Sequence, residues 1–148
     1  MIKFLNQEII FFHMKKSRPF STVRFLRELL EYSGVISPYD FWKILTEEKN
    51  RKTSYNSVCR LFCILEKCGL IKQSKIDKEI VNGFGRKLAK KYYEAVSLDE
   101  YEVPDFILND EYFKGKSKEE IYKMLWSNPQ LIFPSYRERH SEKYKKKL

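Results

Sequence analysis

The residues best suited to metal binding or redox chemistry are gathered in one short stretch. Cys59, Cys63 and Cys68 fall within ten residues of one another. A structural zinc site needs four ligands, usually in two pairs of cysteines or histidines with about two to four residues between the members of each pair. Spacings of four and five residues, with no adjacent histidine, match no such pattern. We therefore expect thiols in a helix, two of them in its core and one exposed, and no metal or cofactor.

A faint pattern of acidic and basic residues is the one hint of catalysis. Pro104-Asp105, followed by Glu111 and Lys114, resembles the motif of metal-dependent nucleases. The glutamate and the lysine are one residue too far apart, however, and no strands are evident that would hold the carboxylates. His13 and His140 are single and distant, with no nearby nucleophile. The sequence therefore predicts that the protein is not an enzyme, and magnesium-dependent cleavage would test the alternative.

Length and charge restrict the class of protein further. The chain of 148 residues is 43% hydrophobic and 16% aromatic, enough for one domain with a core. Its net charge of +9 is uneven, because residues 51–93 carry +8 and residues 137–148 carry +4, whereas residues 94–136 carry −5. This asymmetry suggests a polyanionic partner, with a solvated basic face as the alternative.

The sequence gives no sign of a membrane segment or of secretion. No apolar run approaches the length of about 18 residues that a transmembrane helix needs. The N-terminal stretch 1–14 is apolar but interrupted by Asn6-Gln7-Glu8, which makes a poor signal peptide. We expect an intracellular protein that does not bind a membrane.

Capping signals and apolar spacing predict three helices in the first half of the chain. The first follows Ser21-Thr22 and stops at Gly34, and the second begins at Ser37-Pro38. The third starts at Thr53 or Ser54 and runs to Cys68. It has an apolar arc, expected in the core (Val58, Leu61, Phe62, Leu65 and Cys68), and a polar face opposite (Asn56, Arg60, Cys63 and Lys67).

Beyond Gly69 the pattern changes to that of strands. Residues 70–76 predict a short strand, which a turn at Asp77-Lys78 would reverse into a return strand over residues 79–81. Asn82-Gly83 is itself a strong hairpin signal, so the position of the turn stays open.

The second half of the chain is predicted to return to helices. Residues 86–96 predict a fourth helix, with a set of apolar residues on one side. From Ser97 the chain is acidic and aromatic, and Ser117–Glu120 forms a capping box that opens a short helix. The tail 137–148 is basic and is predicted to be helical or frayed.

Three helices, a two-stranded hairpin and a further helix follow one another as in a winged helix-turn-helix domain. Residues 53–71 resemble the recognition helix and first wing strand of such proteins, where a polar first turn leads to a Leu-Glu-Lys, small residue, Gly-Leu-Ile ending. Residues 85–91 resemble the segment after the wing in archaeal and bacterial regulators of the MarR and PadR kind. The resemblance covers roughly residues 20–96, with Gly83-Phe84-Gly85 standing where the family often has a threonine cap.

The resemblance implies a fold class and a domain organisation. The fold is expected to be mainly α with a small β-hairpin (α+β). A winged helix-turn-helix domain would span residues 21–96, between an N-terminal extension (1–20) and an acidic, aromatic helical extension with a basic tail (97–148).

The resemblance also implies a function, the sequence-specific binding of double-stranded DNA by a transcriptional regulator. The recognition helix 53–68 would lie in the major groove, and the wing 70–84 would lie on the backbone. No pattern in the sequence indicates the operator, the regulatory sign or a small-molecule effector.

The same resemblance assigns roles to individual residues. Asparagine can pair through two hydrogen bonds with adenine, and arginine with guanine, so the start of the recognition helix would contact base edges. The base-contacting residues would be Ser54, Tyr55, Asn56 and Arg60. Basic residues beside the helix and on the wing would contact phosphates, which sets affinity and register but not sequence. These residues would be Arg51, Lys52, Lys72, Lys75 and Lys78.

A second function stays open at this stage. Winged helices also serve as protein-interaction modules within larger assemblies. The aromatic side chains of residues 97–136 could form such an interaction surface, or they could cover the core of the domain itself. Salt-dependent binding of duplex DNA would separate the two functions.

Apolar residues at the flanks of the domain predict a homodimer. Residues 1–12 and the helix expected over residues 86–96 both need a surface to bury against. A two-fold dimer would read two inverted half-sites about 10 base pairs apart. In the competing outcome, residues 97–148 fold back over the same apolar segments and leave a monomer.

Overall fold

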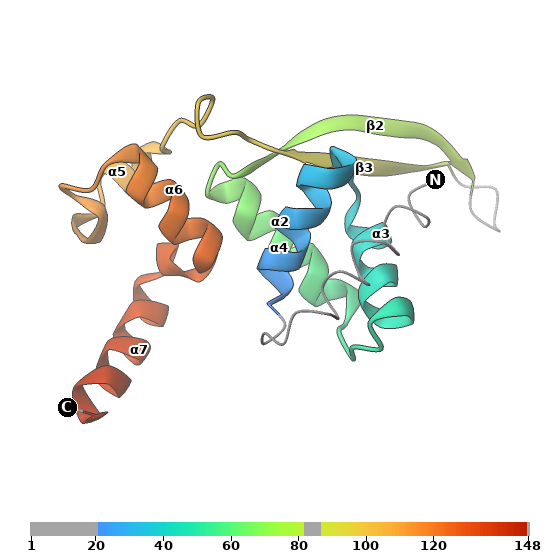
Figure 1. The fold of residues 1–148 in the computed structure, drawn as a ribbon. Helices are drawn as coiled ribbons and strands as arrows, with labels where there is room; N and C mark the ends of the chain where they lie inside the picture. The colour runs from blue at the N-terminus through green and yellow to red at the C-terminus, as the bar shows by residue number, and fades with distance from the viewer. Residues whose placement is uncertain (1–20, 82–86, 148) are drawn as a thin grey trace.

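The structure, a computed structural model, describes residues 21–81 and 87–147, with side chains over residues 21–74 and 91–140. This part of the chain is mostly helical with one small antiparallel sheet, the α+β class that the sequence predicts (Figure 1). The elements follow in the order α2 (Thr22–Ser33), β1 (Val35–Ile36), α3 (Pro38–Lys43), the π-helical turn η1 (Ile44–Glu48), α4 (Tyr55–Lys67), β2 (Ile71–Val81), β3 (Lys87–Ala95), α5 (Asp105–Leu108), the 3-10 turn η2 (Glu111–Phe113), α6 (Lys118–Ser127), the 3-10 turn η3 (Pro129–Ile132) and α7 (Pro134–Lys147).

The sheet brings together strands from distant parts of the sequence. Its order is β1-β3-β2, so β3 lies in the centre and β1, which follows α2, lies at one edge. Ile36 pairs with Tyr93, and Ile71 lies opposite Ala95. Figure 1 shows β2 and β3 extending together beyond the helices. The sequence does not predict β1, because a two-residue strand has no periodicity.

Helices α2, α3 and α4 each begin after a serine that caps the helix. The Oγ atoms of Ser21, Ser37 and Ser54 accept hydrogen bonds from the backbone N–H three residues later, at 3.3, 3.1 and 3.1 Å. Each bond satisfies a donor that has no partner within the helix. At the other end of α2, Gly34 has a φ of +84°, a conformation that few residues other than glycine adopt. These predicted helix boundaries are confirmed.

One continuous hydrophobic core joins the helices, the sheet and the segment that follows them. It includes Phe25 and Leu65 from the N-terminal helices, and Tyr101 and Leu125 from the segment after residue 97. The hydroxyl of Tyr101 donates to the carbonyl of Cys68 at 2.8 Å, across 33 positions of sequence. The acidic and aromatic segment therefore covers the core, which was one of the two expectations for it.

Residues 87–95 form a strand and not the helix predicted over residues 86–96. Leucine, alanine and lysine give this stretch helical propensity, but β3 pairs with a strand on each side. The ring of Tyr93 also packs edge-on against Phe62, with the centroids 5.5 Å apart. Pairing and packing outweigh local propensity here.

The hairpin is longer than predicted. Strand β2 is continuous over Ile71–Val81, so the chain does not turn at Asp77-Lys78. The wing expected over residues 70–84 corresponds to a hairpin whose second strand ends at Ala95. The alternative turn signal, Asn82-Gly83, lies outside the described residues.

The cysteines differ from the expectation of two buried thiols. Cys68 is buried, Cys59 is half-buried and Cys63 is exposed. Burial raises the pKa of the Cys68 thiol to about 12. Within residues 21–81 and 87–147, among the side chains that the structure describes, no three histidine, cysteine or acidic residues are grouped to hold a metal. None of the helices in those ranges combines the length and the apolar character that a membrane span requires.

Candidate nucleic-acid interface

Helix α4 presents a polar face to solvent because its other side is fixed in the core. Val58, Phe62 and Leu65 are buried. The positions opposite them, at spacings of four, three and four residues, are all exposed: Asn56, Arg60, Cys63 and Lys67. This is the division into two faces that the sequence predicts. The exposed row offers amide, guanidinium and ammonium donors to a partner.

Three aromatic rings hold the loop before α4. The indole N–H of Trp42 donates to the carbonyl of Thr53 at 2.8 Å, which ties α3 to the turn that precedes α4. The rings of Tyr39 and Tyr55 each lie 5.8 Å from the ring of Trp42 and 6.2 Å from each other. Both tyrosines remain 43% exposed. The cluster therefore fixes the first turn of α4 while keeping two aromatic edges at the surface.

The hydroxyl of Tyr55 stays protonated at physiological pH. Loss of solvation, followed by the adjacent Cys59 thiol and by Tyr39, raises the pKa of Tyr55 to about 12. A neutral phenol can donate and accept hydrogen bonds, and it does not add negative charge to this surface.

The four predicted base-contacting residues lie at the N-cap and on the first turns of α4, but they are not equivalent. The Oγ of Ser54 is already used as the helix cap and also donates to the Oγ of Ser57 at 2.8 Å. Tyr55 is packed in the aromatic cluster. Asn56 and Arg60 are exposed and one helical turn apart. Of the four, these two are the best placed to contact a partner.

The site predicted from the sequence did not include the other members of the aromatic cluster, Tyr39 and Trp42. Their spacing of three residues places both on one side of α3, and this signal is present in the sequence. The hydrogen-bond partner of Trp42 is eleven residues away in a loop, which no periodicity indicates.

The five predicted phosphate-contacting residues are also unequal. Lys52 is exposed and Arg51 is half-buried. The Nζ of Lys72 lies 3.4 Å from a carboxylate oxygen of Glu94 and 3.8 Å from one of Glu100. A phosphate would have to compete with these two carboxylates for Lys72. Lys75 and Lys78 belong to β2, but their side chains lie outside the described ones.

The C-terminal end of the α4 face adjoins the segment that leads into α7. The Nζ of Lys67 lies 5.8 Å from the ring centre of Phe106 and 5.9 Å from that of Phe133. Phe133 immediately precedes α7. The exposed row on α4 and the start of α7 are therefore parts of one surface.

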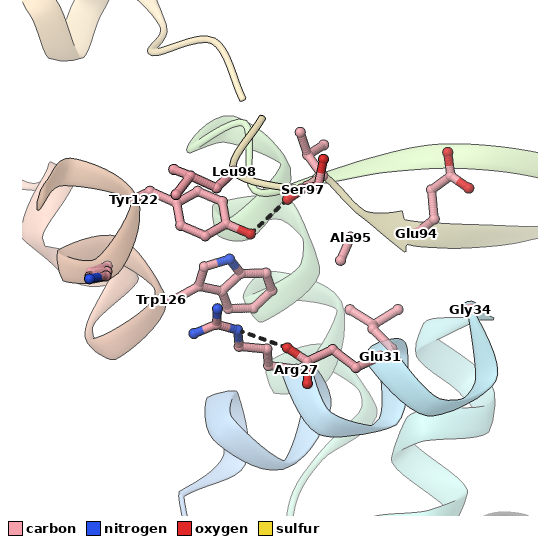
Figure 2. A pocket seen from close by; sticks show the side chains of 12 residues that line it. Arg27, Glu31, Gly34, Glu94, Ala95, Ser97, Leu98, Tyr122 and Trp126 are labelled. Atoms are coloured by element: carbon pink, nitrogen blue, oxygen red, sulfur yellow. Dashed lines mark hydrogen bonds and ion pairs between the residues drawn. The ribbon is translucent and has the colours of Figure 1, made fainter. Parts of the chain in front are cut away.

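A separate pocket of about 530 Å³ opens where α2, the end of β3 and α6 meet (Figure 2). The rings of Tyr122 and Trp126 form one wall, and the guanidinium of Arg27 lies 5.8 and 5.3 Å from their centres. The charged residues that line the pocket are paired with neighbouring charges: Arg27 with Glu31, Lys123 with Glu119, and Glu94 with Lys72. A charged ligand would have to disrupt one of these pairs, so the pocket offers mainly apolar and aromatic surface.

Comparisons with known proteins assign no family. No protein-family model matches the chain, and neither a curated protein nor a solved structure is similar enough to count as a match.

Proposed function

We propose that the protein binds double-stranded DNA through a winged helix-turn-helix domain and acts as a transcriptional regulator. In this proposal α4 lies in the major groove and the β2–β3 hairpin is the wing on the backbone. The observation that carries the proposal is the exposed polar row on α4, which lies opposite the buried apolar face of a helix that a long basic hairpin follows directly in the sequence.

The topology of the first part of the chain supports this proposal. A winged helix needs three helices, with a short strand after the first, and then a hairpin whose second strand pairs with that short strand. Here β1 follows α2, α3 and α4 come next, and the sheet order is β1-β3-β2. The short strand is a feature that the resemblance at the sequence level did not include, so it is an independent argument.

The chemistry of the α4 face suits base edges. The major groove is wide enough for an α-helix, and the residues near the start of that helix reach the bases. Asn56 and Arg60 are exposed at this end of α4. The aromatic cluster of Tyr39, Trp42 and Tyr55 holds the same end in position, which limits the entropy that binding would cost.

The distribution of charge supports a polyanion as the partner. Residues 51–93, which include α4 and most of the hairpin, carry a net charge of +8. Lysine and arginine side chains that neutralise phosphates release condensed counterions, and binding then weakens steeply with salt.

Salt dependence of duplex binding is the first test. If residues 51–93 of each chain neutralise about five phosphates, this segment should make the logarithm of the association constant fall against the logarithm of salt concentration with a slope of about −4 to −5. Fluorescence anisotropy with a labelled random duplex, from low to moderate salt, measures this slope. A slope near zero would rule out the proposed function.

The alternative function, a winged-helix module that binds another protein, has one observation in its favour. Three large side chains of the acidic segment are exposed, although half of its aromatic residues are buried: Phe106 (43%), Leu108 (52%) and Tyr112 (43%). Two of them already contact cations of this chain, since Lys67 lies over Phe106 and Arg137 lies 4.6 Å from the centre of the Tyr112 ring. We therefore place this alternative second.

Of the two observations that favoured a homodimer, one no longer applies. Residues 86–96 were expected to offer a helix for a partner, but β3 is part of the sheet, and the hydroxyl of Tyr122 donates to the carbonyl of Val96 at 2.8 Å. The extension after residue 97 therefore covers the end of residues 86–96, which is the arrangement expected for the competing monomer. Residues 1–12, the other proposed contact, lie outside the described residues, so the dimer stays a prediction.

A further inference from the structure

Helix α7 has the composition of a helix that does not pack through an apolar face. Residues 134–147 include six basic side chains (Arg137, Arg139, Lys143, Lys145, Lys146 and Lys147) and two acidic ones (Glu138 and Glu142). Their net charge of +4 is spread over a helix of 14 residues, about 21 Å long. A helix that is polar on all sides gains little from burial against its own protein.

The start of α7 is nevertheless held firmly to the body of the protein. The Nη2 of Arg137 lies 3.0 Å from the Oδ2 of Asp110 in a half-buried ion pair. This hydrogen bond holds the pKa of Asp110 below its usual range. The side-chain amide of Asn128 donates to the hydroxyl of Tyr136 at 2.8 Å. These contacts hold the start of α7 against the body. Figure 1 shows the direction in which α7 leaves it.

The place of α7 relative to α4 is also fixed. Because Lys67 lies over both Phe106 and Phe133, α7 starts beside the C-terminal end of the exposed α4 face. In Figure 1 the hairpin extends to one side of α4, and α7 extends to the other. If a duplex contacts both α4 and the hairpin, the DNA that continues beyond α4, away from the hairpin, would therefore lie on the side of the protein where α7 is.

We propose that α7 is a second DNA-binding element, which contacts the phosphate backbone flanking the site occupied by α4. This inference rests on the proposed function and adds a surface that the winged-helix resemblance, which ends near residue 96, does not include. A helix of about 21 Å passes about six phosphates of one strand. A lipid surface fits less well, because an interfacial helix needs a large apolar face. Contacts to phosphates would raise affinity without changing sequence preference.

Two variants with equal loss of charge test the proposal. In the tail variant Lys143, Lys145, Lys146 and Lys147 are each changed to Gln, which leaves the anchoring residues Tyr136 and Arg137 intact. In the control variant four exposed lysines elsewhere on the extension are changed to Gln: Lys114, Lys116, Lys118 and Lys123. Circular dichroism and thermal unfolding establish that both variants are folded.

The expected result is a loss specific to the tail variant. Each lost phosphate contact lowers the salt slope by about 0.9, so the tail variant should lose about 3.6 units of slope on a random duplex of about 24 base pairs and return towards the slope that residues 51–93 alone produce, with about tenfold or more lost in affinity near 0.1 M salt. The control variant should change the slope by less than about half a unit. On a duplex of about 10 base pairs, one helical turn, the tail variant and the wild type should converge.

Three outcomes would overturn the inference. If the wild type binds duplex with a steep salt slope and the tail variant keeps it, α7 makes no contact, while the proposed function stands. If both variants lose the same slope, net charge and not the position of α7 is responsible. If the tail variant loses affinity only for an unstructured single strand, α7 serves a different nucleic acid. A wild type with no salt-dependent duplex binding would instead refute the proposed function itself.

Discussion

Replacing Phe62 with alanine is expected to lower the free energy of unfolding by about 3–5 kcal/mol. Phe62 is 1% exposed, and its ring packs against Phe41 of α3 at 6.0 Å and against Tyr93 of β3 at 5.5 Å. The substitution would leave a cavity where α3, α4 and the sheet meet. Urea denaturation followed by circular dichroism measures the change.

The matched control is the same substitution at an exposed phenylalanine. Phe106 is 43% exposed, so Phe106→Ala should cost less than about 1 kcal/mol. Equal losses for the two variants would show that α4 does not turn its apolar arc into the core. The polar face would then not be oriented as described.

Replacing Arg60 or Asn56 with alanine is expected to cost about 1–3 kcal/mol of binding free energy on the preferred DNA site. Each variant should also relax the preference at one base pair, because each side chain can form paired hydrogen bonds with one base. Lys75→Ala should act differently: it should weaken binding to all sequences alike and flatten the salt slope by about one unit. Selection of bound sequences from a random library, followed by titrations, measures both effects.

A uniform loss at Arg60 would argue against this assignment. If Arg60→Ala weakened specific and random duplexes equally, Arg60 would contact the backbone. The α4 helix would then have to lie in the groove in a different orientation. Thermal unfolding controls for folding, and little change in stability is expected because Arg60 is exposed.

The faces and ends of the N-terminal helices could be predicted because local chemistry determines them. Serine caps at Ser37 and Ser54 supply an oxygen to an unpaired backbone donor. The apolar arc of α4 repeats at helical spacing, so the sequence shows which side is buried and, by difference, that Asn56 and Arg60 are exposed.

The sheet could not be predicted fully because pairing between distant strands determines it. Lys87–Ala95 has the composition of a helix, and only its two neighbouring strands make it a strand. One of these, Val35–Ile36, is too short to carry a pattern of its own.

The candidate site was predicted only in part for a similar reason. The polar row on α4 follows from the helical period, but what its members do locally depends on neighbours elsewhere in the sequence. The packing of Tyr55 against Trp42 and the ion pairs of Lys72 with Glu94 and Glu100 depend on residues brought close by the fold. Judged by side-chain type alone, Tyr55 and Lys72 are as good candidates for contacting DNA as Arg60.

The reactivity of the three cysteines can show directly whether the exposed face of α4 is covered. Cys63 is exposed between Arg60 and Lys67 on the row proposed to enter the groove, whereas Cys68 is buried with a pKa raised to about 12 and should not react in the folded protein. A Cys59→Ala variant leaves Cys63 as the accessible thiol of α4. Its rate of alkylation, measured by mass spectrometry with and without DNA, reports whether this face is covered.

Alkylation of Cys63 in the presence of duplex is therefore the most direct test that α4 binds DNA. With at least about nine-tenths of the protein bound, the rate should fall by about tenfold, and it should recover when salt releases the DNA. Cys68 should remain unmodified under both conditions. A rate at Cys63 that does not change on a protein shown by anisotropy to be bound would contradict the account, because DNA would then lie on another face.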